Sequence, residues 1–125
     1  MSVDLQSDQI VWTYNNPEES FFAVPAVSEK YVVIGSRDKK LICLDRQTGD
    51  EVWTFPTEGS VNSSPVICGS KVIFGADDGF LRILNVSDGK QTWSTNLGRP
   101  ILSSPAIADN IVLIGCDDGY VYAFK

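Results

Sequence analysis

The feature that most constrains the fold of this sequence is a repeat of about 40 residues. It is read from two sets of positions: Pro25, Pro65 and Pro105, and Gly35, Gly75 and Gly115. Trp53 and Trp93 keep the same spacing, whereas Trp12 precedes Trp53 by 41 because the first period holds one extra residue. A period of 20 to 50 residues is typical of solenoids, propellers and other arrays. The repeat therefore determines the architecture before any single motif does.

Each period contains four short apolar segments separated by turn-forming residues. Three of the four segments are seen in the third period, at 103–107, 111–115 and 120–124. The remaining segment of the unit is illustrated by residues 51–55 of the first period. The segments are rich in β-branched and aromatic residues, which is the signature of strands. None of them is long enough for three helical turns, so the helical repeats of similar period are excluded.

The separating turns follow the same period. Asp-Asp-Gly stands at 77–79 and 117–119, and Arg37-Asp38-Lys39 has the same place without a glycine. Both Asp-Asp-Gly segments favour hairpin turns, because glycine tolerates positive φ and Asp can hydrogen-bond the backbone of its own turn. A calcium site is the alternative, but two adjacent Asp side chains cannot supply six or more oxygen ligands. Proline near the start of each unit indicates that the first strand lies at a sheet edge.

Four antiparallel strands per period, the middle ones apolar on both faces, require sheets stacked on sheets, and radial stacking provides this. We predict an all-β fold of β-propeller blades, three in number, each of four antiparallel strands and about 40 residues. The expected repeats cover 18–57, 58–97 and 98–125, the last without its outer strand. Residues 1–17 are expected to supply an outer strand, over 9–14, that completes a blade.

Leu44–Trp53 resembles the tryptophan-docking motif of the quinoprotein-like (PQQ-type) repeat β-propeller family, A-x-D-x-x-T-G-x-x-x-W. Leu84–Trp93 is a second copy with Asn85 in place of Asp, and Asp4–Trp12 is a degraded third. The resemblance covers nearly the whole chain. It assigns blade docking to Asp4, Trp12, Asp45, Thr48, Gly49, Trp53, Asn85, Gly89 and Trp93.

The resemblance implies that each docking indole packs against the neighbouring blade and donates its N–H to a main-chain carbonyl. Family enzymes that oxidise alcohols use an adjacent pair of cysteines and a bound calcium, whereas this chain has no adjacent cysteines. Many members lack the cofactor and act as scaffolds of envelope assembly or as interaction domains. We therefore expect no catalytic residues, no cofactor and no metal.

Composition excludes several other classes. The net charge is −6 and the ten Lys and Arg are scattered, which disfavours a nucleic-acid partner. The chain has no His and no C-x₂-C pair, so it lacks the ligands of a zinc site and the base of a His-dependent catalytic triad. No run of 18 apolar residues exists, so no membrane span is expected. Cys43, Cys68 and Cys116 lie in apolar segments and are expected to be reduced and shielded.

The expected partner-binding residues lie in loops, since loops on a rigid scaffold often carry recognition. They are Arg37, Asp38, Lys39, Glu58, Asn62 and Arg99. The alternative is that these are ordinary solvated charges, as isolated surface charges usually are.

Two hypotheses of function follow. The first is a noncatalytic propeller scaffold that binds a protein or peptide, and the second is a fragment of a larger PQQ-dependent quinoprotein dehydrogenase whose catalytic residues lie in other blades. The first residues show no secretory signal, so the expected location, the periplasm or envelope of a bacterium, comes from the resemblance. Three blades are too few to close a ring, which predicts self-association through open blade faces.

Overall fold

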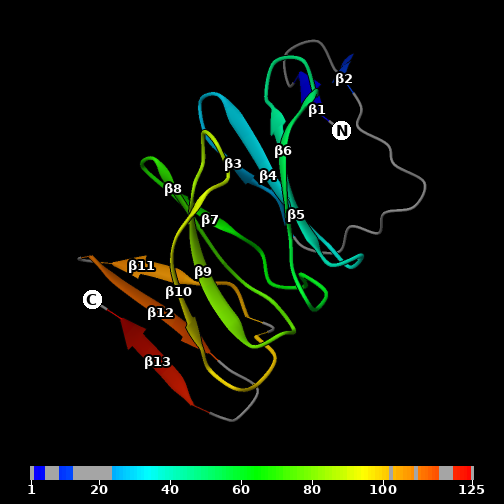
Figure 1. Cartoon of the computed structure of the whole chain (residues 1–125). Helices are drawn as coiled ribbons and strands as arrows, with labels where there is room; N and C mark the ends of the chain where they lie inside the picture. The colour runs from blue at the N-terminus through cyan, green and yellow to red at the C-terminus, as the bar shows by residue number, and fades with distance from the viewer. Residues whose placement is uncertain are drawn as a thin grey trace.

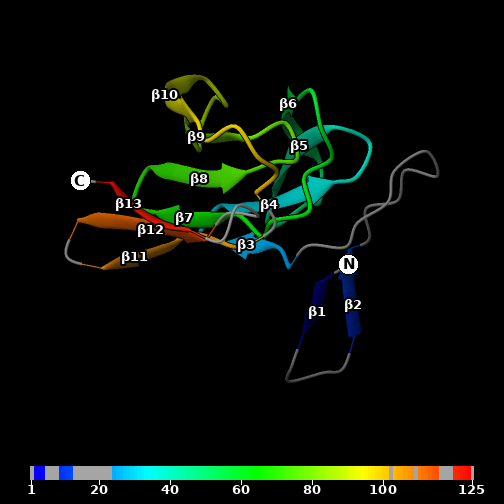
Figure 2. The same ribbon diagram turned by 90° about the horizontal axis from the view of Figure 1, so that it is seen from below.

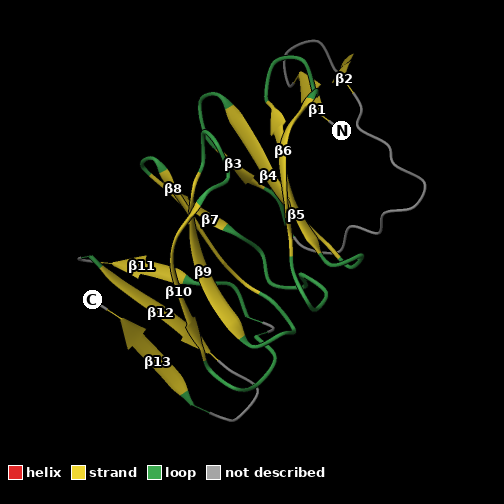
Figure 3. Ribbon diagram, viewed as in Figure 1, coloured by secondary structure: helices red, strands yellow, loops and turns green. Residues whose placement is uncertain are grey.

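The computed structural model describes residues 2–4, 9–12, 24–101, 103–108, 110–115 and 120–124. These residues form antiparallel strands joined by turns and loops, and Figure 3 shows no helix among them. The described ranges accordingly contain no helix with the length and apolar character needed to cross a membrane.

Three sheets follow one another along the chain, and each keeps its strands in sequence order. The first contains β3 (Ala26–Val27), β4 (Tyr31–Ser36), β5 (Lys40–Asp45) and β6 (Glu51–Pro56). The second contains β7 (Val66–Cys68), β8 (Lys71–Gly75), β9 (Phe80–Asn85) and β10 (Gln91–Asn96). The third contains β11 (Ala106–Ala108), β12 (Ile111–Gly115) and β13 (Val121–Phe124).

The sheets lie side by side as an open row of propeller blades (Figure 1). Figure 2 shows the first strands β3, β7 and β11 toward one side of the molecule and the last strands β6 and β10 toward the other. The first strand of each sheet is an edge strand, and β7 and β11 begin directly after Pro65 and Pro105. The prediction of an all-β partial propeller is confirmed.

The pairing of the last two strands is the same in the first and second sheets. Trp53 lies opposite Cys43 and Trp93 opposite Ile83, and in both pairs the register shifts at the residue before the Trp. At the N-terminus β1 (Ser2–Asp4) pairs with β2 (Gln9–Trp12) in the same way, with Trp12 opposite Ser2. The expected outer strand over 9–14 is therefore seen over 9–12, already paired with β1. That it completes another blade stays a prediction.

Apolar side chains fill the two junctions between the sheets. One cluster joins Val33, Leu41 and Cys43 of the first sheet to Val72, Phe74 and Leu84 of the second. The other cluster joins Ile73 and Leu81 of the second sheet to Ile114 of the third. β5 and β8 are buried on both faces, whereas β12 of the third sheet is only partly buried.

The repeated glycines permit close approach at these junctions. A Cβ at Gly35 would lie 2.6 Å from a methyl carbon of Val61, and one at Gly75 would lie 2.3 Å from a methyl carbon of Ile101. Val61 and Ile101 are themselves buried and hold the same place in consecutive periods. The 40-residue glycine spacing therefore reflects contact between sheets.

The cysteines do not share one environment. Cys43 is fully buried, and burial, together with the negative charge of Asp45, raises its pKa to about 12. Cys68 is exposed, which corrects the expectation that it is shielded, because it is the last residue of β7 and adjoins the Gly69 turn. Cys116 lies outside the described residues.

Candidate functional site

The junction between the first two sheets is organised around Trp53 on β6. Its indole Nε1–H donates to the main-chain carbonyl of Val86 at 2.8 Å, and Val86 lies in the turn after β9 of the next sheet. The ring also packs against the apolar cluster of this junction. Trp53 is partly buried, and a Trp at a junction stabilises it most when its single donor has a partner, as the indole has here.

Gly89 provides the surface against which this indole lies. A Cβ at Gly89 would be 2.5 Å from ring atom Cδ2 of Trp53, and the residue has a φ of +72°. Its N–H donates to the carbonyl of Asn85 at 2.8 Å, which fixes the turn. Glycine is required here for both its conformation and its lack of a side chain.

The polar residues of the docking motif shape the turns. Asp45 Oδ1 accepts the N–H groups of Gln47 and Thr48, and Thr48 Oγ1 accepts that of Asp50. Gly49 completes this turn with a φ of +78°. In these contacts the polar side chains bond their own turn rather than the neighbouring sheet.

The other two docking tryptophans differ from Trp53. Trp93 is 39% exposed and meets Phe124 of β13 edge to face, with ring centroids 5.5 Å apart. The side chains of Asp4 and Trp12 lie outside the described part of the chain, although their strands pair in the repeated register.

The residues expected to bind a partner lie on connections at one end of the antiparallel sheets: residues 37–39 in the turn from β4 to β5, Glu58 and Asn62 between β6 and β7, and Arg99 between β10 and β11. Thr57 N–H donates to the carbonyl of Lys39, and Ser60 Oγ donates to the carbonyl of Arg37. These bonds bring the 37–39 turn against the 57–62 connection. Arg99 lies beside the next turn, because a Cβ at Gly79 would meet its N and O at 3.3 Å. We call this end the loop face, defined by Arg37, Asp38, Lys39, Glu58, Asn62 and Arg99.

A buried ion pair underlies the loop face. Asp78 accepts two hydrogen bonds from the guanidinium of Arg82, at 3.2 and 2.7 Å, and one each from the N–H groups of Phe80 and Glu58. Burial alone would raise the pKa of Asp78, but the hydrogen bonds and charge of Arg82, with the two backbone donors, hold that pKa below its ordinary value. Asp78 therefore remains ionised and ties the connection from the first sheet to the second.

The neighbouring Asp77 contacts the loop face directly. Its Oδ2 accepts from Asn62 Nδ2 at 3.0 Å, while its buried Oδ1 has no hydrogen-bond partner among the described residues. Within those residues no cluster of three or more His, Cys, Asp or Glu side chains could hold a metal ion. The Asp77-Asp78 pair thus serves the turn and the junction in the contacts that the structure describes.

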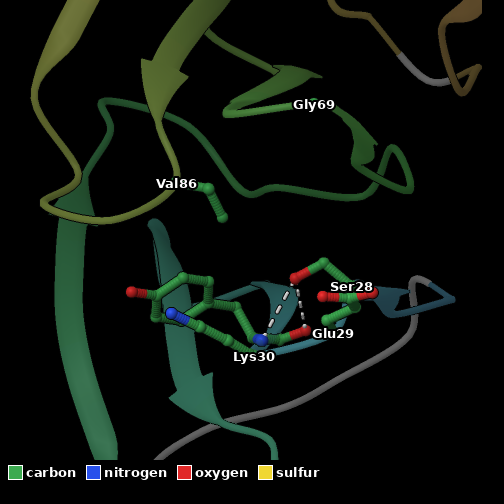
Figure 4. A pocket seen from close by; sticks show the side chains of 6 residues that line it. Ser28, Glu29, Lys30, Gly69 and Val86 are labelled. Carbon is green, nitrogen blue, oxygen red and sulfur yellow. Dashed lines mark hydrogen bonds between the residues drawn. The ribbon is translucent and has the colours of Figure 1, made fainter.

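Two hollows flank the first junction. One has a volume of about 290 Å³ and lies at the end opposite the loop face. Figure 4 shows how Ser28, Glu29 and Lys30 face Gly69 and Val86 there. The other, of about 370 Å³, lies between β6 and β10 and includes Phe55, Phe80 and Arg82. We call the second hollow the junction pocket. Sequence reasoning missed Arg82, although a signal existed, since the equivalent residues Ile42 and Tyr122 are uncharged.

Comparisons with known proteins agree with this architecture. A family model described as "Outer membrane protein assembly factor BamB" matches residues 1–125. The crystal structure of BamB from Moraxella catarrhalis is similar, with a TM-score of 0.77 and 30% identity over 89% of this chain and 35% of that chain. The quinohemoprotein alcohol dehydrogenase ADHIIG from Pseudomonas putida HK5 has a TM-score of 0.78 at 20% identity, over 89% and 20% of the two chains, which shows a shared fold. The comparison with curated proteins gives no match.

Proposed function

We propose that this chain, which belongs to the family of the outer membrane protein assembly factor BamB, is part of a noncatalytic β-propeller that binds a protein or peptide partner. The family is one of PQQ-like repeat propellers, in agreement with the resemblance of the docking motifs. The chain covers 35% of the length of BamB from Moraxella catarrhalis. The proposal concerns the surface that this part contributes.

The loop face is the observation that carries the proposal. Its backbone is fixed by hydrogen bonds between consecutive connections, while Lys39, Glu58 and Arg99 are exposed. Rigid loops that present charged and polar groups of both signs suit recognition of a polar protein surface, because little ordering entropy is lost on binding. The family name supports a partner in outer-membrane protein assembly and a location in the bacterial envelope.

Site-specific photo-crosslinking tests this proposal. A photoreactive residue replaces Lys39 or Arg99 on the loop face, and as a control it replaces Ser87 or Lys90, which are exposed in and after the turn at the other end of β9. Expression in a bacterial periplasm should give one discrete crosslinked protein of the outer-membrane assembly apparatus from the loop face and none from the control positions. Equal crosslinking at both ends would contradict the proposal.

Self-association is a second part of the proposal. Large apolar side chains are exposed mostly on or next to the first and third sheets, and Trp93 of the second sheet is exposed as well: Val24, Val27, Val52, Trp93, Leu113, Tyr120 and Val121. Exposed apolar surface on stacked sheets favours association with a second copy of the chain. Light scattering at micromolar concentration should give a mass above that of one chain, 13.7 kDa. A single-chain mass with normal solubility would show that these faces are tolerated in water.

A further inference from the structure

The turn on which the Trp53 indole docks contains a chemically reactive pair of residues, Asp88 and Gly89. The carboxyl group of an Asp that precedes glycine is open to attack by the next backbone nitrogen, because glycine has no side chain to obstruct the approach. The same pair occurs at Asp78 and Gly79, and both glycines have positive φ, +72° at Gly89 and +87° at Gly79. The described part of the chain therefore offers two copies of one pair for comparison.

The local backbone contacts of the two pairs are alike. Asp88 Oδ1 accepts the N–H of Lys90 at 2.9 Å, and Asp78 Oδ1 accepts that of Phe80 at 3.0 Å. A hydrogen bond to the residue two places ahead folds each carboxyl group back over the following peptide, toward the glycine nitrogen. Both glycine N–H groups also donate to a carbonyl of their own turn, at 2.8 and 3.1 Å. Local geometry therefore does not separate the two pairs.

The tertiary contacts distinguish the two carboxyl groups. Asp78 also accepts two bonds from the guanidinium of Arg82 and one from the N–H of Glu58, and its side chain is only 4% exposed. These partners occupy both of its oxygens and hold the pKa of Asp78 below its ordinary value. Asp88 is exposed, and among the described residues its carboxylate has only the bond to Lys90. Since an ionised carboxylate is a poor electrophile, Asp88 is the more reactive of the two.

We propose that Asp88 is a site of spontaneous isomerisation to isoaspartate, and that this change disrupts the turn on which Trp53 docks. The Gly89 nitrogen attacks Cγ of Asp88, a C–N bond forms with loss of one water, and a cyclic imide results. Water then adds to the former main-chain carbonyl carbon of Asp88, whose bond to nitrogen breaks, so that the backbone continues through Cγ. One water is lost and one is gained, and no oxidant or cofactor takes part.

Isoaspartate lengthens the backbone by one methylene at a point of close contact. A Cβ at Gly89 would lie 2.5 Å from ring atom Cδ2 of Trp53, and the N–H of Gly89 is bonded to the carbonyl of Asn85. An extra methylene before Gly89 shifts this residue relative to both groups, and a packed junction has little room for the shift. The carbonyl of Val86, which accepts the indole N–H, lies in the same turn. Isomerisation of Asp88 should therefore loosen the first junction, whether or not a partner binds at the loop face.

Ageing of the native chain at neutral pH tests the proposal. Peptide mapping under mildly acidic conditions, with fragmentation that distinguishes the two backbone forms, measures isoaspartate at each Asp-Gly pair. Incubation in H₂¹⁸O marks the reaction, because hydrolysis of the imide introduces one oxygen from the solvent. The same chain in denaturant is the reference, because the pairs there lack the tertiary contacts that distinguish them. The pair Asp118 and Gly119 lies outside the described residues and is mapped separately.

In the native chain isoaspartate should form several-fold faster at Asp88 than at Asp78, whereas the two rates should be similar in denaturant. Asp88→Glu keeps the charge but would have to close a larger ring, so this variant should not isomerise at the turn. The aged parent chain should unfold at a lower urea concentration than the fresh one, and Asp88→Glu should lose less on ageing.

Three results would overturn the proposal. The first is a ratio of the two rates that is the same in the native chain and in denaturant, and the second is no reaction at Asp88 in the native chain. The third is a parent chain with isoaspartate at position 88 that unfolds like the fresh chain. Because none of these measurements involves a partner, they are independent of crosslinking at the loop face.

Discussion

The indole N–H of Trp53 bonds the main-chain carbonyl of Val86, 33 residues later, at 2.8 Å. This one contact joins the outer strand of the first sheet to a turn of the second. The thiol of Cys43, which lies opposite Trp53, is 3.9 Å from the same carbonyl oxygen. The docking motif therefore acts between blades, through the side chain of one copy and the turn of the next.

Gly89→Ala should destabilise the chain more than Gly69→Ala. Both glycines have positive φ, +72° and +60°, so an alanine at either costs about 1 kcal/mol of backbone strain. Only Gly89 lies against the Trp53 ring, while a Cβ at Gly69 would meet nothing within 4 Å. The added clash should cost roughly 1–3 kcal/mol more in chemical denaturation. Equal losses would mean that the indole does not dock on Gly89.

Trp53→Ala should lower the free energy of unfolding by about 3 kcal/mol, because it removes a large ring from a packed junction. Trp93→Ala should cost markedly less, since Trp93 is 39% exposed and packs edge to face on Phe124. Trp53→Phe isolates the hydrogen bond to Val86 and should cost about 1 kcal/mol beyond the lost ring area. Urea unfolding of the three variants measures the loss in free energy of unfolding of each. A larger loss for Trp93→Ala than for Trp53→Ala would refute the prediction.

Asp78→Asn should make stability less sensitive to acid. The pKa of Asp78 in the folded chain lies below its ordinary value of 3.8, so the ionised carboxylate stabilises the fold above that pH. This contribution is lost as pH falls from 3.8 through the folded pKa. The parent chain should therefore exceed the variant most at neutral pH, and the gap should narrow in acid.

Denaturant unfolding over a pH series measures this gap. Asp88→Asn is the control, because Asp88 is exposed and its carboxylate accepts the N–H of Lys90 without the ion pair that Asp78 has. A gap between Asp78→Asn and the parent that stays constant with pH would count against an ionised, buried Asp78.

The thiols of Cys43 and Cys68 should react at very different rates. The thiolate is the reactive form, and the pKa of Cys43 is raised to about 12 in its fully buried site, whereas Cys68 is exposed. In a Cys116→Ser background, a thiol reagent should modify Cys68 in the native chain and Cys43 only after unfolding. Mass spectrometry of the modified peptides measures both rates. Comparable native rates would show that the first junction is open.

The fold could be predicted because its determinants are local and repeated. Turn residues, proline positions and β-branched segments recur every 40 residues, so one period predicts the next. The Arg37-Asp38-Lys39 turn shows how far this extends: Lys39 adopts a φ of +67° where the equivalent Gly79 has +87°. The 40-residue repeat therefore predicted the turn at residues 37–39 although Lys39 replaces the glycine there.

The docking of Trp53 on the next sheet agrees with what the motif implied, but the other junction contacts could not be predicted, because they depend on which side chains of two sheets meet. Cys68 lies in an apolar segment, yet it ends its strand and is exposed. Arg82 stands out from Ile42 and Tyr122 in the sequence, but its pairing with Asp78 and its place between Phe55 and Phe80 require the packed sheets. A residue that differs from its equivalents in the other periods can be found in the sequence, but its contacts are known only from the structure.

A titration with pyrroloquinoline quinone and calcium tests most directly whether this chain is itself noncatalytic. The chain is mixed with both, freed of unbound quinone, and examined for quinone absorbance and for alcohol-dependent reduction of a dye. A noncatalytic scaffold predicts no retained absorbance and no dye reduction above the level of free quinone. Retention of one quinone per chain with alcohol-dependent turnover would contradict that account.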